Sequence, residues 1–273
     1  MIARREQVLN YAILGFFSLL ALYPIVGIVL TALAPPGEQV GLSLPSSLHL
    51  GNFREAWDEG HFATYLRSSV IVAVSVVAAS TVLSILSGFA FGTMRFRGST
   101  VLFYVFLLGL MVPQEALVVP LYFDLRRLEL TDTYWALILP QVALSVAFGT
   151  FWMRSFFLAA PRSLLEAARI DGANEFRIFW TVVMPLATPV LATLGILTFL
   201  GNWNSFIYPL VMAQEPDMYT LPVALATFAT GQYQADHGML MAGSVILVVP
   251  VLIVFILFQR WITEGIATTG LKG

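Results

Sequence analysis

The chain has 273 residues, of which 58% are hydrophobic and 11% are charged, and its formal net charge is −2. Soluble globular domains carry about 25% charged residues, so this sequence has too few to cover a water-exposed surface, and membrane residence is the leading interpretation. The 14 lysines and arginines form no basic stripe, which disfavours nucleic-acid binding. The absence of cysteine excludes disulfides, thiolate catalysis and cysteine-ligated metals.

Six stretches with few or no charges are predicted to cross the membrane, because a spanning helix needs about 20 apolar residues. In chain order they are Val8–Leu33, Ser68–Met94, Gly98–Gln114 with its continuation Ala116–Phe123, Thr133–Met153, Ile178–Gln214 and Gly238–Gln259. The sequence therefore predicts an all-α integral membrane protein with six transmembrane helices.

The first run could be mistaken for a signal peptide, since Arg4 and Arg5 precede it and Ala32-Leu33-Ala34 imitates a cleavage site. The apolar region of a signal peptide is only about 7–15 residues long. The run Val8–Leu33 is far longer, and we interpret it as an uncleaved first span.

The third run is interrupted near its outer end. Pro113 and Pro120 predict that the helix bends or ends there. Glu115 is an intramembrane carboxylate, a kind of group that is often functional, but beside Gln114 it can also simply reach outer water, and we favour that interpretation. The charged segment 123–133 that follows is predicted to be an outer amphipathic connection.

The distribution of basic residues predicts the orientation, because cytoplasmic segments are enriched in lysine and arginine. With the N-terminus in the cytoplasm, the cytoplasmic segments hold ten of these residues and the outer segments hold four. The six spans then place both termini in the cytoplasm. We predict a multi-pass protein of the cytoplasmic (inner) membrane.

Metal binding is not predicted. His49, His61 and His237 lie in or beside outer segments, and no two of them have metal-ligand spacing on one helix. The small residues Gly88, Gly92 and Gly109 are most simply explained by close packing between helices.

A predicted cytoplasmic segment at about residues 154–184 carries the strongest local signals. Pro161 suits the first turn of a helix, and Gly172 suits a helix end that needs positive φ. We expect Leu164, Leu165 and Ala168 on one face, and Arg162, Glu166 and Arg169 on another.

A second helical stretch is predicted at about residues 174–183, with Phe176, Phe179 and Val183 on one side. The short helix before it has two alanines and a charged stripe, a pattern suited to docking in a groove of a partner. The charged side chains could equally pair with one another on a wet surface, and the residues alone leave both interpretations open.

The string Glu166-Ala167-Ala168, then Gly172, then Val182-Val183-Met184-Pro185 resembles the cytoplasmic signature loop of binding-protein-dependent ABC importer permeases. Valine and methionine replace the isoleucine and leucine of that signature and conserve volume. The segments Phe199–Val211, Tyr219–Leu225 and Gln259–Gly273 resemble the maltose-type carbohydrate branch. The resemblance therefore runs along nearly the whole chain.

The resemblance implies that residues 1–273 form a single ABC importer transmembrane domain, with its core at about 64–262, that moves sugars or related polyols. It implies a heterodimer with a second permease subunit, two ATPase subunits, an extracytoplasmic solute-binding protein and surrounding membrane lipid. The loop 161–184 between spans four and five would be the coupling element. Contact with the ATPase would involve Glu166, Ala167, Ala168, Asp171, Gly172 and Pro185.

The chain itself is predicted not to be an enzyme. A phosphate-binding P-loop needs Gly-x-x-x-x-Gly-Lys-Ser/Thr, and the only lysine, Lys272, is followed by Gly273. We therefore expect no cofactor on this chain, with ATP and Mg²⁺ on the partner ATPase.

Three residues of the fifth run are candidates for a substrate pathway. Asn202, Trp203 and Asn204 lie roughly 25 Å along a helix from Pro185. Amides can hydrogen-bond sugar hydroxyls and an indole can stack on a sugar face. The alternative is hydrogen bonding between helices and an interfacial tryptophan.

Two other classes of membrane protein fit this sequence less well than an importer subunit. A secondary transporter usually has ionisable groups at mid-membrane and repeated halves, whereas this sequence offers only Glu115 and no visible repeat. An intramembrane enzyme needs a nucleophile with a base, or a metal cluster, within its spans, and the sequence shows neither.

Overall fold

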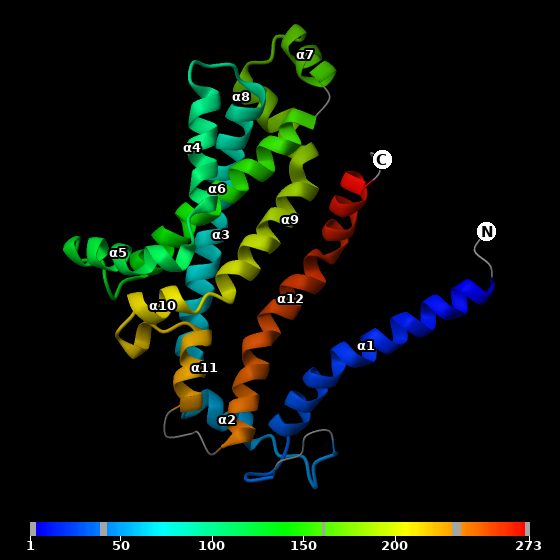
Figure 1. Cartoon of the computed structure of the whole chain (residues 1–273), viewed down its shortest axis with the longest axis vertical. Helices are drawn as coiled ribbons and strands as arrows, with labels where there is room; N and C mark the ends of the chain where they lie inside the picture. Colours follow the sequence, from blue (N-terminus) through cyan, green and yellow to red (C-terminus); the bar gives the residue numbers. More distant parts are fainter. Residues whose placement is uncertain (1–3, 39–42, 160–161, 231–235, 271–273) are drawn as a thin grey trace. The chain divides into compact units, whose positions relative to one another are not determined.

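The computed structural model describes residues 4–38, 43–159, 162–230 and 236–270, with Arg5, Arg162 and residues 262–270 described by their backbone alone. These residues form helices joined by turns and loops (Figure 1). The helices are α1 (Arg4–Ala32), α2 (Gly51–Asp58), α3 (Phe62–Thr93), α4 (Ser99–Met111), α5 (Gln114–Arg127), α6 (Tyr134–Ala159), α7 (Arg162–Ile170), α8 (Glu175–Ile178), a π-helix (Phe179–Val183), α9 (Met184–Trp203), α10 (Ile207–Met212), a 3-10 helix (Pro216–Met218), α11 (Leu221–Thr230) and α12 (His237–Gly270).

Five helical segments are long and apolar enough to cross a membrane, which confirms the all-α membrane fold. They correspond to the first, second, fourth, fifth and sixth predicted runs. The third run is broken, because α4 and α5 meet at 99°. A count of six spans therefore holds only if this bent pair counts as one.

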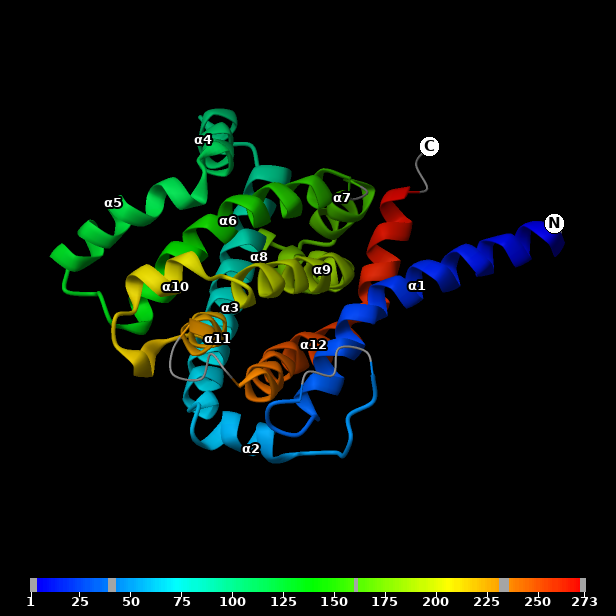
Figure 2. The same cartoon turned by 60° about the horizontal axis from the view of Figure 1, so that its bottom comes forward.

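The bend follows from the sequence. Val112 and Pro113 have extended backbone angles between α4 and α5, since a proline disfavours helical geometry in the residue before it. The bend expected at Pro113 is thus present, whereas Pro120 lies inside α5. In Figures 1 and 2, α5 runs away from the axis of α4. Much of the expected connection at 123–133 is the last turn of this helix.

The fifth run is also divided. Its spanning part, Glu175–Trp203, begins before the predicted start and ends at Trp203. A turn at Asn204 and Ser205 then leads into the short helix α10. The predicted run Ile178–Gln214 therefore contains one span and a separate short helix.

The chain divides into two compact units, Met1–Leu66 with Leu221–Pro250, and Arg67–Thr220 with Val251–Gly273. In the first unit, the buried Asn52 amide joins α2 to the end of α1 by donating to the carbonyl oxygens of Ala32 and Ala34 at 3.0 and 2.8 Å. Phe62 packs edge-on against Phe228 of α11. The remaining length of α1 is exposed, as expected for a helix that faces lipid.

The second unit is held together by α3, α4, α6 and α9. Helix α6 contacts both α4 and α9. A Cβ at Gly88 of α3 would lie 2.5 Å from the Cβ of Met153 on α6, and one at Gly92 would lie 2.8 Å from the Cβ of Phe157. These two glycines therefore permit close helix packing, as expected, whereas Gly109 has ordinary spacing to Ala147.

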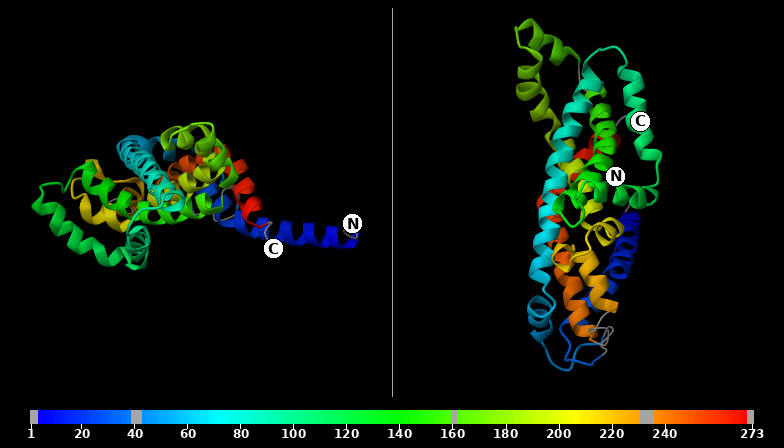
Figure 3. Two further views of the ribbon diagram at one scale, coloured as in Figure 1. Left: turned by 90° about the horizontal axis from the view of Figure 1, so that it is seen from above. Right: turned by 90° about the vertical axis from the view of Figure 1, so that its left-hand side faces the viewer.

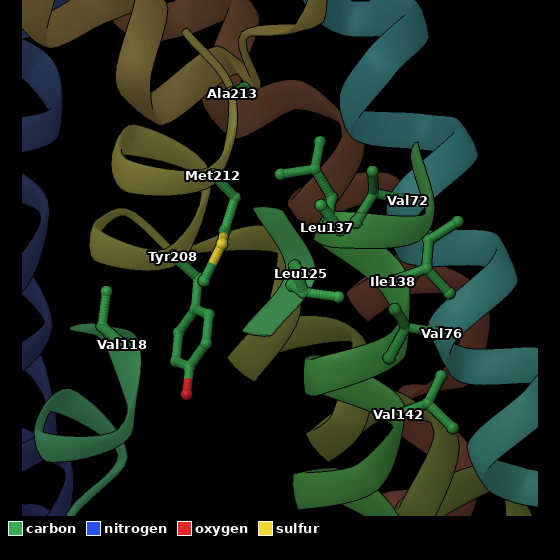
Figure 4. Packing of buried hydrophobic residues seen from close by; sticks show 11 residues of the cluster. Val72, Val76, Val118, Leu125, Leu137, Ile138, Val142, Tyr208, Met212 and Ala213 are labelled. Carbon is green, nitrogen blue, oxygen red and sulfur yellow. The ribbon is translucent and has the colours of Figure 1, made fainter. Parts of the chain in front are cut away.

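Two apolar clusters lie in the second unit. Figure 4 shows the first, where Val72 and Val76 of α3 face Ile138 and Val142 of α6. Tyr208 of α10 belongs to the same cluster, so α10 and α5 are packed onto the spanning helices. The second cluster joins α3, α6, α8 and α9, and its members are Ile85, Phe89, Met153, Phe157, Ile178, Phe179, Val183, Ala187 and Leu194.

Candidate functional site

The predicted signature loop folds as a helical hairpin, α7 followed by α8. At the end of α7, Gly172 has φ +80°. The N–H of Gly172 donates to the carbonyl of Arg169 at 3.1 Å, and the N–H of Ala173 donates to the carbonyl of Ala168 at 3.0 Å. This pair of bonds is a Schellman motif, which needs a left-handed residue and favours glycine. The expected helix and its glycine end are thus present, while Pro161 lies outside the described residues.

One side of α7 packs on the protein. Leu165 and Ala168 are half-buried against the second apolar cluster, and so is Ala173 beyond the turn. Leu164 was expected on the same face, but its side chain is 44% exposed and does not share their environment. Figure 3 (right) shows α7 at the end of the second unit where α3 turns into α4.

The other side of α7 is charged and exposed. Arg169 donates from Nε to Oε1 of Glu175 at 2.9 Å, which links α7 to α8. The hydrogen bond and charge of Glu175 raise the pKa of Arg169 above its ordinary value. Arg169 therefore forms its ion pair with Glu175 and not with Glu166, the partner that one of the two interpretations of the sequence gave it. The Arg162 side chain lies outside the described residues.

Glu166 lines a hollow of about 500 Å³ beside α7. The opposite wall is the end of α3, with Arg95 just beyond it, and the end of α6, including Phe157. Among the described side chains, none donates a hydrogen bond to the Glu166 carboxylate or forms an ion pair with it. Ala167 and Asp171 are also exposed. These groups are available to a partner.

The second half of the loop leads into a spanning helix. The Asn174 side chain accepts a hydrogen bond from the N–H of Arg177 at 2.8 Å and so caps α8. Ile178 and Phe179 are buried, but Phe176 is 73% exposed. The expectation that Phe176 shares a face with Phe179 and Val183 is therefore wrong for Phe176, whose ring contacts Trp180 edge-on. Phe179 and Val183, at the two ends of a π-helix, are both buried.

Pro185 lies in the first turn of α9 and is exposed. The spanning segment is continuous from Glu175, so Pro185 stands inside the span rather than at its start.

A second hollow, of about 300 Å³, lies farther along the second unit. Its wall comes from the α4–α5 bend, α6, α9 and α10, helices that are labelled in Figure 1. The polar residues that line it are Gln114, Gln141, Ser145, Thr198, Asn202, Ser205 and Tyr208. No aspartate, glutamate, lysine or arginine is among the described residues that line it.

The three pathway candidates are separated by the structure. Asn202 lines the second hollow and donates to the Thr198 carbonyl at 2.7 Å and to Ser145 Oγ at 3.4 Å. Trp203 is only 3% exposed and stacks on Phe199, with ring centroids 5.3 Å apart. Asn204 is exposed and donates to the Leu200 carbonyl. Of the three, only Asn202 reaches the hollow.

Sequence reasoning missed the partners of Asn202 in this wall. Gln141 could have been noticed in the sequence, because it is a polar residue inside the predicted span Thr133–Met153. In the structure its side chain is only 4% exposed. Buried amides in membrane helices are rare and often functional. Within the part of the chain that the structure describes, no group of three or more metal-ligating side chains is present.

The family described as binding-protein-dependent transport system inner membrane component matches residues 80–268. The arabinooligosaccharides transport system permease protein AraQ of Halalkalibacterium halodurans is 38% identical, over 95% of this chain and 94% of its own length. The trehalose/maltose transport system permease protein MalG of Thermococcus litoralis is 31% identical, over 98% of this chain and 99% of its own.

A solved structure with the same fold comes from a bacterial ABC transporter involved in the import of the acidic polysaccharide alginate. The TM-score is 0.78 at 25% identity, and the alignment covers 95% of this chain and 98% of that one.

Proposed function

This chain belongs to the family of binding-protein-dependent transport system inner membrane components and is a membrane-spanning permease subunit of an ABC importer; we propose that its cargo is a sugar or related polyol. The observation that carries the proposal is the full-length similarity to a permease named for arabinooligosaccharides. The relative named for trehalose and maltose supports it.

The working assembly in this proposal has four further protein subunits. A second permease subunit completes the pathway, two ATPase subunits bind ATP and Mg²⁺, and an extracytoplasmic solute-binding protein delivers the sugar, all within or beside the lipid membrane. The missing P-loop lysine supports a separate ATPase. This chain then contributes no catalytic residue and no cofactor site.

Coupling to the ATPase is assigned to the hairpin 161–184. Helix α7 exposes Glu166, Ala167 and Asp171, and the Schellman turn at Gly172 fixes the direction of the chain that returns to α9. Leu165 and Ala168 anchor α7 to the apolar cluster. A push on α7 is therefore transmitted to α8 and the spanning helix α9 as a rigid-body movement.

The test of this assignment is Glu166→Lys. A charge reversal at a partly desolvated contact can cost about 3–5 kcal/mol, whereas at a solvated position it costs at most about 1 kcal/mol. We expect normal membrane insertion with loss of ATPase association and of uptake. Glu59→Lys, a reversal at an exposed acid beyond α2, is the matched control and should transport normally. Normal uptake by Glu166→Lys contradicts the assignment.

Orientation is part of the same proposal, with both termini and α7 in the cytoplasm and the α1–α2 connection outside. The bias of ten basic residues against four supports it. Because the chain has no cysteine, single cysteines can be introduced cleanly. Ser46→Cys should react with an impermeant thiol reagent in intact cells, and Ser163→Cys should not. The reverse pattern overturns the orientation.

A further inference from the structure

We infer that the second hollow is a contact site for one uncharged sugar unit, and that this subunit thereby favours neutral over acidic saccharides. The inference rests on the proposed sugar cargo and names its chemical class. Two features carry it: the hydrogen-bonding groups that remain free in the wall, and the absence of charged side chains from its described residues.

Three side chains in the wall, two amides and one hydroxyl, use only part of their hydrogen-bonding capacity within the protein. Gln141 donates one N–H to the Leu137 carbonyl at 2.7 Å, and no described residue donates to its Oε1. Asn202 donates to Thr198 and to Ser145, which leaves its Oδ1 as an acceptor. Ser145 accepts from Asn202, so its own O–H is free to donate. The wall thus offers acceptors and donors together, as the hydroxyls of a sugar require.

The position of these groups makes them significant. Gln141 is only 4% exposed within α6, yet its Oε1 is not among the buried polar atoms that lack a partner, so this oxygen is open to the hollow that Gln141 lines. A ligand hydroxyl can therefore bond to Oε1 without displacing a hydrogen bond of the protein. Phe148 adds an aromatic ring to the same wall, which suits the C–H face of a sugar ring. A concave wall that combines hydrogen-bonding groups with apolar side chains is typical of small-molecule sites.

Charge explains the preference against acids. A carboxylate or phosphate brought into this wall would lose hydration without a cationic partner, which is strongly unfavourable. Glu115 follows Gln114 in the chain, and its negative charge would repel an acidic ligand rather than attract it. The volume of about 300 Å³ is at the small end of the range of about 300–1,000 Å³ for ligand pockets. One sugar unit therefore fits better than a long chain.

The experiment uses the importer complex, reconstituted in proteoliposomes with its binding protein for uptake, and without that protein for direct binding by saturation-transfer NMR. The probes are two neutral trisaccharides, maltotriose and arabinotriose, and the acidic trigalacturonate. Gln141→Met keeps side-chain length but removes the amide, and Ser145→Ala is a milder second variant. Thr188→Val is the control, because Thr188 lies on α9 and does not line the hollow.

We expect wild type to bind and import at least one neutral trisaccharide and to reject trigalacturonate. Gln141→Met should lower the neutral binding signal and uptake at least fivefold at normal complex yield, Ser145→Ala should lower them less, and Thr188→Val should not change them. If Gln141→Met and Ser145→Ala both import the neutral trisaccharides as well as wild type does, this inference is wrong, while the proposed function still stands. Trigalacturonate imported as well as the neutral sugars overturns the preference. Import of none of the three overturns the sugar cargo and this inference with it.

Discussion

The hairpin around α7 and the second hollow differ in how far apart in the sequence their residues lie. The hairpin is made within residues 162–183, from a helix, a glycine turn and a capped second helix. The hollow takes its wall from the α4–α5 bend, α6, α9 and α10, through residues such as Gln114, Gln141, Asn202 and Tyr208. The first is a local structure presented to a partner, and the second exists only when the whole unit has packed.

The two regions also differ in the charge of the side chains that they present. The hairpin exposes charged groups, among them Glu166, whose energies depend on what docks against them. The hollow presents uncharged amides and hydroxyls inside spanning helices. Charge suits a contact that forms and breaks in water, whereas a buried neutral wall suits a ligand that arrives without a counter-charge.

The largest effect is expected where the local structure depends on one backbone angle. Gly172 has φ +80°, and a β-branched residue is strongly disfavoured there, with a cost of at least about 1–2 kcal/mol. Gly172→Val should therefore break the Schellman turn and reduce uptake more than about tenfold while the chain still inserts in the membrane, because Gly172 precedes the span that begins at Glu175.

Gly172→Asn is the matched control, since asparagine tolerates the left-handed region. It should retain most uptake, measured alongside membrane levels of both variants. Equal uptake by the valine and asparagine variants would show that the shape of the turn does not matter for coupling.

A smaller effect separates two neighbouring amides. Asn202 lines the hollow and Asn204 does not. Asn202→Leu removes hydrogen bonds worth about 0.5–1.5 kcal/mol each, so we expect uptake to fall by about threefold to tenfold. Asn204→Leu should leave uptake near wild type. The same loss in both variants would point to helix packing rather than to contact with the cargo.

The contrast also explains what the sequence could predict. Helix α7 and its end at Gly172 were predictable because caps and turns are encoded within a few neighbouring residues. The spans were predictable from apolar length, but the 99° bend between α4 and α5 was foreseen only as a break near Pro113. A proline marks where a helix stops and not the direction in which the next one runs.

The hollow was not predictable as a set. Asn202 was a candidate, but Trp203 and Asn204 beside it point elsewhere, since successive helical residues are 100° apart around the axis. Gln141 is 61 residues away in the chain, and only the packing of α6 against α9 brings the two amides to one wall. Similarly, the π-helix at Phe179–Val183 has no reliable signal in a single sequence.

The smallest effect is expected at the ion pair between Arg169 and Glu175. Both side chains are 44% exposed and the N–O distance is 2.9 Å, so the pair contributes no more than about 0.2–1 kcal/mol. Arg169→Ala should therefore reduce uptake only about twofold at low salt, and added salt should diminish the difference by screening.

Reversing both charges should restore only part of the loss, because Arg169 also stands in the last turn of α7 and Glu175 in the first turn of α8. Each charge now matches the dipole of its own helix, and the exchange would oppose both. If Arg169→Ala abolishes uptake as completely as Gly172→Val, the ion pair cannot be a minor brace, and Arg169 itself must contact the ATPase.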